Sequence, residues 1–505
     1  MSRTRPGTTR APGPGVRSLL RFGPQLLRDD AVEVAVSLRE RYGHVVRIPP
    51  IYPGLDAAAY LATHPDDVRT VLQTDPTSFR GLDVPGSDDF AAAVRGSILG
   101  APEGGGDWWV RRFRRLSPEF NERHVATTVP AMVREATATF DEYLGAGGDE
   151  THRTGPRGDP AAVADGGDGV RVKPLASRLS LRLLGASLLD GDVRVHEATV
   201  IRAVARLRRA FKRRAYGVVT GPVTRRLPDD VVERFARVRA PLRPDWIDPE
   251  RDPLGDLHAV AEAVVARRER FPRAFDDAIT TWRARRDPIT GETLSRSDAV
   301  AEVAGMLIAG FATVSAALTW AVFSVATRPD LQDALAAEAA DSTVLHGTDG
   351  SPSYADLLAD LPLATRVWRE TLRLYPTLPV FGRTATEPVT LSGYDLEPGS
   401  TVLVSPFVTH RDPAFWDRPT SFDPDRFRGE RPAERPEFAY YPFSAGPHGC
   451  LGRRVATGEA VVSLATLVGD YRFTLCGDPD AVGVDSAINL EPDRDVRARF
   501  EPRAD

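Results

Sequence analysis

The sequence is poor in cysteine and in lysine. Its 505 residues contain two cysteines, Cys450 and Cys476, and two lysines, Lys173 and Lys212, so nearly all of the basic residues are arginine. Two cysteines exclude a framework of several disulfides and fit a reducing compartment, which predicts a cytoplasmic protein. The net charge of −5 argues against general binding to nucleic acid.

Long hydrophobic runs are also scarce. Residues 1–15 are basic and rich in proline and glycine, with no apolar stretch behind them, so we expect a disordered tail and no signal peptide or membrane anchor. Val303–Ala326 alone is long and apolar enough to span a bilayer. Small and polar residues such as Gly310 and Ser315 occupy its middle. This pattern favours a helix buried in a protein core and predicts no membrane span.

The periodicity of the chain indicates a mainly α protein with a minor β portion. Helical periodicity dominates from Pro174 to about Leu374, whereas most of the chain after Pro376 has the pattern of short strands and turns. A segment at about 145–169 is rich in Gly, Asp and Pro and is expected to be a surface insertion. No linker divides the chain, which favours a single large domain over residues 16–505.

Local signals predict several smaller elements. Val45–Ile48 and Ala59–Ala62 are typical of strands, and Asp107–Leu116 is typical of a helix that ends near Pro118. Arg202–Arg214 is predicted to be a strongly basic helix. A solvated face is the favoured interpretation of its charge, and a docking surface for an acidic partner or lipid headgroups is the weaker one.

The most informative segment is Phe443–Gly452, with the sequence FSAGPHGCLG. The glycines around Cys450 allow the backbone to approach a flat, bulky group. Amide hydrogen bonds to the sulfur and the N-terminus of the arginine-led helix that follows would both favour a thiolate over a thiol. A thiolate held in this way is a strong ligand for iron.

This run resembles the haem-binding loop of the cytochrome P450 family, Phe-x-x-Gly-x-(Arg or His)-x-Cys-x-Gly. Phe443, Gly446, His448, Cys450 and Gly452 fill its defined positions, and the resemblance extends over nearly the whole chain. It implies haem b as the cofactor, with Cys450 as the axial ligand of the iron. It also implies one P450-type domain with a long central helix over the haem.

A second motif lies at the end of the helical region. Glu370 and Arg373 are three residues apart on a predicted helix, so their side chains can meet. Apolar neighbours suggest burial, and a buried pair needs a further polar partner. The resemblance implies that Arg426, in Pro-Asp-Arg-Phe, is this partner. The three residues are then a structural network that fixes the scaffold on the haem side and performs no chemistry.

The family's central helix carries Ala-Gly-x-(Asp/Glu)-Thr, and here the run is Ala309-Gly310-Phe311-Ala312-Thr313. The resemblance implies catalytic roles for Ala309, Gly310 and Thr313, with Gly310 making space for oxygen and Thr313 assisting protonation. The acid that normally relays protons from solvent is replaced by Ala312. Water chains, a substrate hydroxyl or the use of a peroxide would have to take its place.

The resemblance also implies polar partners for the haem propionates. Two of these are Arg383 and His448. In the third long helix, Trp108 and Arg112 keep the spacing of the family's tryptophan and arginine. A count back from the Leu-Ser-Pro that ends this helix shifts the register by one residue. The residues selected by that register are Trp109 and Phe113, with Arg114 as a substitute cation.

The resemblance implies a monooxygenase that hydroxylates or epoxidises a small hydrophobic substrate. A ferredoxin or flavoprotein would supply electrons, docking on the cysteine side of a monomer. A positive patch is expected there, formed by Arg111, Arg115, Arg453 and Arg454. Ala312 suggests a first alternative, a peroxide-using or hydroperoxide-rearranging enzyme. A second is a non-catalytic haem sensor, against which the retention of Gly310 and Thr313 argues.

Overall fold

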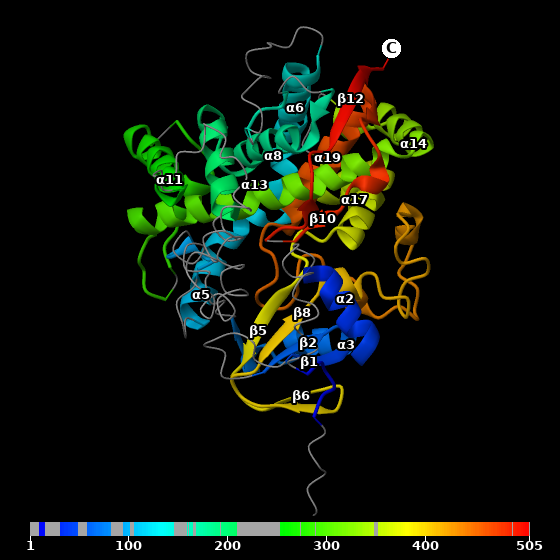
Figure 1. Ribbon diagram of the computed structural model, residues 1–505. Helices are drawn as coiled ribbons and strands as arrows, with labels where there is room; N and C mark the ends of the chain where they lie inside the picture. Colours follow the sequence, from blue (N-terminus) through cyan, green and yellow to red (C-terminus); the bar gives the residue numbers. More distant parts are fainter. Residues whose placement is uncertain are drawn as a thin grey trace, which may run out of the picture.

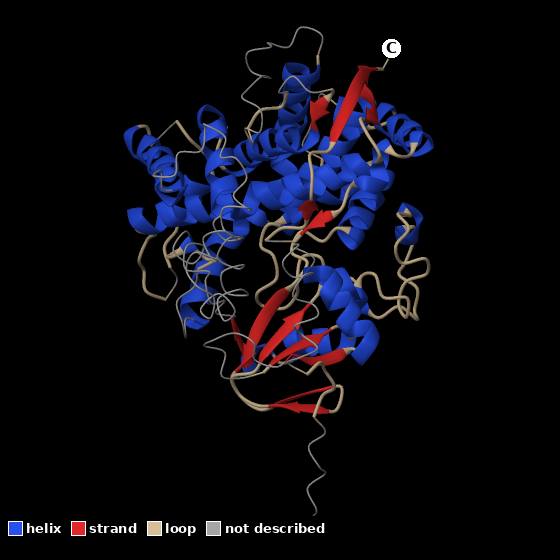
Figure 2. Cartoon of the chain, viewed as in Figure 1, coloured by secondary structure: helices blue, strands red, loops and turns tan. Residues whose placement is uncertain are grey.

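The chain forms a large helical body and a smaller β-rich portion (Figures 1 and 2). This arrangement confirms the predicted mainly α fold with a minor β portion. The computed structural model describes residues 10–15, 31–48, 58–81, 94–100, 106–145, 159, 161–164, 168–191, 193–209, 253–272, 274–287, 289–347, 352–486 and 488–503.

The helical body is built around one long central helix, α13, which contacts α8, α11, α17 and α19 (Figure 1). The longer helices are α2 (Ala31–Tyr42), α5 (Gly106–Leu116), α6 (Glu122–Leu144), α8 (Val172–Leu188), α11 (Pro253–Arg270), α13 (Arg296–Ala326), α14 (Pro329–Ala340), α17 (Pro362–Leu374) and α19 (Arg453–Asp470). The shorter ones are α3 (Pro65–Arg69), α12 (Ala278–Ala284), α15 (Thr343–His346), α16 (Tyr354–Asp360) and α18 (Pro406–Thr409). Residues 197–209 are also helical.

The largest sheet has five strands in the order β1-β2-β8-β5-β3. β2 and β8 are parallel, and the other neighbours are antiparallel. These strands are β1 (Val45–Ile48), β2 (Ala59–Ala62), β3 (Phe79–Gly81), β5 (Phe381–Ala385) and β8 (Thr401–Val404). The remaining pairings are β4 (Val170–Arg171) and β9 (Tyr471–Leu475) with β12 (Arg497–Pro502), β6 (Val389–Leu391) with β7 (Tyr394–Leu396), and β10 (Val484–Asp485) with β11 (Glu491–Pro492).

The central helix α13 is the apolar segment that matched a membrane span in length. Ser295 caps its N-terminus by accepting a hydrogen bond from the Asp298 amide at 3.0 Å. Among the described residues it is the one helix apolar and long enough to cross a membrane, yet 72% of its apolar window is buried inside the protein. The prediction of a buried core helix is confirmed, because neighbouring helices cover its apolar surface.

The small elements predicted near the N-terminus are also confirmed. β1 and β2 have the predicted bounds, and α5 begins one residue earlier than expected, at Gly106. A short 3₁₀ turn, Ser117–Phe120, follows α5 and contains Pro118. It ends at Asn121, whose side chain caps α6.

Two predictions of solvent-exposed segments need correction. In the expected tail, residues 1–9 lie outside the described residues, but residues 10–15 lie along β1, where the Pro12 carbonyl accepts a hydrogen bond from the Arg47 amide at 2.8 Å. In the expected insertion, residues 146–158 lie outside the described residues, but Asp159 and residues 161–163 are buried. Asp159 accepts hydrogen bonds from Arg202, a partner that the local sequence does not reveal.

The expected solvated face of the basic helix is wrong for the residues that the structure describes. Carboxylates from distant segments pair with its arginines. The pairs are Arg202–Asp159 at 2.7 Å, Arg206–Asp256 at 2.6 Å, and Arg208 with Asp485 at 2.9 Å and Glu491 at 2.5 Å. Residues 210–214 of the predicted helix lie outside the described residues. These ion pairs also oppose the alternative of a free basic docking surface.

Glu459 of α19 is a buried carboxyl group with few polar partners. It is 1% exposed, and its Oε1 accepts a hydrogen bond from the Ser187 hydroxyl at 3.3 Å. No cationic side chain of the described residues lies within ion-pair distance of it. Burial raises its pKa to about 8.

Replacing Glu459 by glutamine should therefore stabilise the protein in a pH-dependent way. A raised carboxyl pKa means that the folded state loses stability as pH rises from the ordinary value of 4.5 to about 8. Glu459→Gln should gain on the order of a few kcal/mol over the wild type at pH 9 and much less at pH 5. Thermal unfolding at both pH values checks this, with the exposed Glu434→Gln as control. Equal gains at both pH values would contradict it.

Candidate functional site

Cys450 lies in a tight loop that leads directly into α19. The Cys450 amide donates a hydrogen bond to the Phe443 carbonyl at 2.9 Å, and the Gly449 amide donates one to the Gly446 carbonyl at 3.1 Å. The Gly452 carbonyl accepts the Ala456 amide at 2.9 Å, so α19 begins immediately after the loop. This folding-back holds the cysteine at the N-terminal end of a helix, where a negative charge is favoured.

The surroundings of the sulfur affect its protonation in opposite directions. Cys450 is a solvent-exposed residue, while desolvation by the protein around its sulfur raises the pKa of the thiol. The backbone N–H of Gly452 and the positive charge of Arg453 lower this pKa. A metal bound at the sulfur would complete the shift, because a coordinated thiol is deprotonated.

The structure requires glycine at one of two positions in the loop, Gly446, and not at the other, Gly452. Gly446 has a φ of +67°, and a Cβ atom there would lie 1.8 Å from the Leu72 carbonyl oxygen. This backbone contact leaves no room for any side chain. A Cβ atom on Gly452 would have nothing within 4 Å, and its φ of −81° suits any residue.

The middle of α13 carries the partly exposed residues of an otherwise buried stretch. From Ala299 to Val322 all residues are buried except five, which are Met306, Ala309, Gly310, Ala312 and Thr313. Residues 306, 309, 310 and 313 share one helix face. We call all five partly exposed residues, these four and Ala312, the open stripe. Leu451, next to the cysteine, packs against the same hydrophobic cluster as Ala312, so the loop and the stripe are joined through that cluster.

Two residues of the open stripe make specific local contacts. The Thr313 hydroxyl donates a hydrogen bond to the Ala309 carbonyl at 2.8 Å, one turn back along the helix. A Cβ atom on Gly310 would lie 2.8 Å from a methyl group of Leu184, so glycine lets α13 approach α8 closely. The role for Gly310 expected from the sequence did not include this packing.

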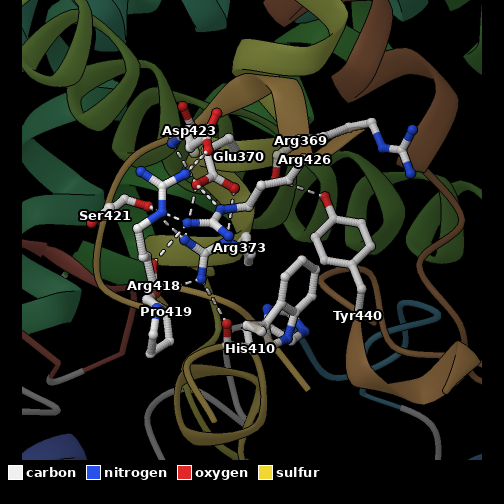
Figure 3. A network of polar contacts seen from close by, with 12 residues as sticks. Arg369, Glu370, Arg373, His410, Arg418, Pro419, Ser421, Asp423, Arg426 and Tyr440 are labelled. Carbon is white, nitrogen blue, oxygen red and sulfur yellow. Dashed lines mark hydrogen bonds and ion pairs between the residues drawn. The ribbon is translucent and has the colours of Figure 1, made fainter. Parts of the chain in front are cut away.

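The structure brings Glu370, Arg373 and Arg426 together (Figure 3). The Arg373 guanidinium donates two hydrogen bonds to the Glu370 carboxylate, at 2.7 and 2.8 Å, and Arg426 Nε donates one at 3.2 Å. The Asp423 amide adds a fourth at 2.8 Å. Glu370 and Arg373 are fully buried, so the pair depends on these partners.

The remaining donors of the two arginines bind backbone carbonyls. Arg373 donates to the carbonyls of His410 at 2.8 Å, Pro419 at 2.6 Å and Ser421 at 3.0 Å. Arg426 donates to the carbonyls of Asp417 and Arg418. The network thus fastens α17 to the segment that precedes the Cys450 loop.

The comparison with protein families identifies this arrangement. The model of the cytochrome P450 family matches residues 260–488, which include α13, the Glu370 network and the Cys450 loop. The matched region, a little under half of the chain, is of the cytochrome P450 kind. Haem b is the cofactor of this family.

Several P450 relatives match parts of the chain. It is 41% identical to cyclooctatin synthase from Streptomyces melanosporofaciens over 197 residues, which are 39% of this chain and 42% of that protein. Cytochrome P450 4c21 from Blattella germanica is 38% identical over 181 residues, 36% of this chain and 35% of that protein. Protein LUTEIN DEFICIENT 5, chloroplastic, from Arabidopsis thaliana is 28% identical over 386 residues, 73% of this chain and 58% of that protein. Each match covers less than two thirds of the relative's length.

The side chains near the P450 loop fit the anionic edge of a haem. The Trp109 and His448 rings lie 4.5 Å apart, and Trp109 stacks on Phe113 at 5.0 Å. Burial lowers the pKa of Arg383, and no carboxylate of the described residues lies within ion-pair distance of it. Burial and the charge of Arg383 lower the pKa of His448, so the two side chains are neighbours. A partly buried cation without a carboxylate partner suits a propionate.

The structure does not bring Trp108 and Arg112 to this place. Arg112 stacks on Trp108 at 4.8 Å and forms ion pairs with Asp298 at 3.1 Å and Glu302 at 3.5 Å on α13. Successive residues of a helix differ by about 100° in direction, so the shift of one residue selects another face. Arg114, the substitute cation, is exposed. The register that begins at Trp109 therefore fits the geometry.

Sequence reasoning missed Glu302. It is 4% exposed, and its Oε2 accepts a hydrogen bond from the Ile98 amide at 3.1 Å. Burial raises its pKa to about 7, although Arg112 opposes the shift. Glu302, Met306, Ala309 and Thr313 are spaced by three or four residues and share a helix face. The sequence offered one signal for Glu302, which is that its carboxylate directly precedes a long apolar run.

The two glycines of the P450 loop offer a matched test. Gly446→Ala should lower the melting temperature by several degrees and reduce haem incorporation, because its methyl group would collide with the Leu72 carbonyl. Gly452→Ala should leave the stability of the cofactor-free chain close to that of the wild type. Thermal unfolding and haem absorbance per protein check both variants. Equal melting temperatures for the two would contradict the assignment.

Proposed function

We propose that the protein is a haem-thiolate monooxygenase that hydroxylates or epoxidises a small hydrophobic substrate with molecular oxygen. A ferredoxin or flavoprotein supplies the electrons. The observation that carries this proposal is the Cys450 loop joined to the open stripe of α13. When bound, the haem supplies the iron chemistry that activates oxygen.

The proposed roles of the chain's own residues follow from their positions. Cys450 holds the iron as a thiolate. Trp109, His448 and Arg383 bind the propionates and fix the orientation of the ring. The first part of the open stripe, from Met306 to Gly310, is apolar and excludes water from the substrate, which supports a hydrophobic compound over a charged one.

Protonation is the step for which the chain differs from the family pattern. Ala312 provides no acid, and Glu302 lies eleven residues before Thr313, about 16 Å along the helix axis. The Thr313 hydroxyl can exchange its bond to the Ala309 carbonyl for one to a water molecule and hold that water in place. Protons then arrive through water or through a hydroxyl of the substrate. Ala312 also favours a second candidate, an enzyme that uses or rearranges peroxides.

The positive surface that could bind an electron donor contains fewer unpaired arginines than the sequence suggested. Arg111 and Arg115 lie 3.9 and 3.7 Å from Asp287, and Arg454 lies 3.0 Å from Glu122. Of the four expected arginines, Arg453 is exposed and has no carboxylate within ion-pair distance among the described residues. Docking on the cysteine side therefore depends on Arg453 and shape more than on a broad positive patch.

The burial of α13 supports a cytoplasmic location.

Replacing the proposed iron ligand tests the central assignment. The reduced carbon monoxide complex of the wild type should show the red-shifted Soret band of thiolate ligation. Cys450→Ser should lose this band or the haem itself, because a hydroxyl is a far weaker donor to iron. Cys476→Ser should keep the wild-type spectrum. An unchanged spectrum in Cys450→Ser would refute the ligand assignment.

Restoring an acid tests the oxidant. With a hydrophobic compound that shifts the haem spin state, Ala312→Asp should increase ferredoxin-driven product formation, by up to ~10²-fold, the lower end of what a general acid contributes. Ala312→Asn provides the control without an ionisable group. Turnover is compared in parallel with hydrogen peroxide. Exclusive use of peroxide by the wild type would overturn the monooxygenase proposal in favour of the second candidate.

A further inference from the structure

A cavity of about 70 Å³ lies beside the Glu370 network. Four guanidinium groups line it, those of Arg369, Arg426, Arg431 and Arg435. One water molecule needs only ~10–15 Å³ of such space, so the cavity can hold a small polyatomic ligand. Figure 3 shows the side chain of Arg369 extending away from Glu370.

Positive charge at this cavity exceeds negative charge. Arg426 and the neighbouring Arg373 share one carboxylate, Glu370. Arg369, Arg431 and Arg435 have no carboxylate within ion-pair distance among the described residues. The cavity lining also contains two carboxylates, those of Glu430 and Glu437. Glu430 is exposed, and Glu437 lies 3.8 Å from Arg69.

The excess charge acts most strongly on Arg435. Burial lowers the pKa of Arg435, and the charges of Arg426, Arg373, Arg431 and Arg369 lower it further. Like charges crowded in a partly desolvated place repel one another and attract an anion. A negative ligand that enters the cavity should therefore stabilise the wild-type protein.

Aromatic rings hold two of the cavity arginines in place. Arg435 lies 4.2 Å over the buried Trp416 ring, and Arg369 lies 4.3 Å over the buried Phe427 ring. Stacking uses the face of a guanidinium and leaves its in-plane N–H groups for a ligand. A planar fork of donors fixed in this way matches the oxygens of a phosphate or sulfate group.

We propose that this arginine cavity is a binding site for a tetrahedral oxyanion, a phosphate or sulfate group. The site is independent of the haem and of the proposed oxygenase activity. The anion is either free in solution or part of a larger molecule such as a nucleotide.

Binding would tie together two parts of the scaffold. Arg369 belongs to α17, whereas Arg426, Arg431 and Arg435 belong to the segment that leads to the Cys450 loop. Tyr440 also lines the cavity, and its hydroxyl donates a hydrogen bond to the Arg369 carbonyl at 2.9 Å. An anion that bridges both sides should therefore raise the melting temperature of the protein.

The test uses the haem-containing protein of 505 residues. Inorganic phosphate is titrated while binding is measured by calorimetry and thermal unfolding, with chloride at matched ionic strength as the reference. Saturable stabilisation by phosphate beyond that by chloride is expected. Adenosine diphosphate and adenosine form the second arm. Tighter binding of the diphosphate than of phosphate assigns the site to a nucleotide, and equal or weaker binding assigns it to the free anion.

Variants locate the binding. Arg435→Gln should raise the dissociation constant of phosphate at least ~10-fold, as loss of one charge-assisted hydrogen bond predicts. Without phosphate it should be as stable as the wild type or more stable, because a repelling charge is gone. Arg428→Gln is the matched control: Arg428 is exposed, pairs with Asp425 at 3.5 Å and does not line the cavity.

Two results would overturn the proposal. One is an effect of phosphate that does not saturate or that equals the effect of chloride, which would mean general screening of charge. The other is a dissociation constant that Arg435→Gln and Arg369→Gln leave unchanged, which would place the anion elsewhere. Both variants are judged on folded protein with normal haem absorbance, so a failure of binding is separate from a failure to fold.

Discussion

A carboxylate as deeply buried as Glu370 is stable only if its hydrogen-bonding capacity is filled. Arg373, Arg426 and the Asp423 amide fill it. The two guanidiniums then bind carbonyls between residues 410 and 421, so a single buried charge organises a long stretch of irregular chain. Irregular backbone has no ladder of its own, and this network supplies the missing partners. The loop that carries Cys450 starts from the chain fixed in this way.

His410 connects this network to the P450 loop and to the sheet. Its carbonyl accepts Arg373, while its ring Nε2 accepts a hydrogen bond from the Tyr441 amide at 2.9 Å. Complete burial, with Arg373 and Arg411 nearby, lowers the pKa of His410 to about 3, so the ring stays neutral and able to accept. The adjacent Thr409 hydroxyl donates to the Thr63 carbonyl, next to β2, at 3.0 Å. Helical body, sheet and cysteine loop therefore meet at two consecutive residues.

Local patterns predicted the elements and the motifs but not the partners of distant side chains. The bounds of β1 and β2, the buried α13 and the Glu370–Arg373 pair follow from alternation, hydrophobicity and spacing within a few residues. The pairing of Arg202 with Asp159 joins segments 43 residues apart and has no local signal. The choice between the Trp108 and Trp109 registers stayed open for a related reason: one residue rotates a helix position by about 100°, and only the packed neighbour, His448, fixes the phase.

Glu302 shows how strongly burial on α13 opposes the ionisation of a carboxyl group. Arg112 lies 3.5 Å away and the Ile98 amide donates to it, yet burial still raises its pKa to about 7. The neighbouring Asp298 carboxylate adds to the rise. Burial on α13 thus favours the protonated form of a carboxyl group even beside a cation. Within the proposed function, the apolar stripe and the missing acid are thus consistent with each other: protons reach the substrate pocket on molecules that enter it.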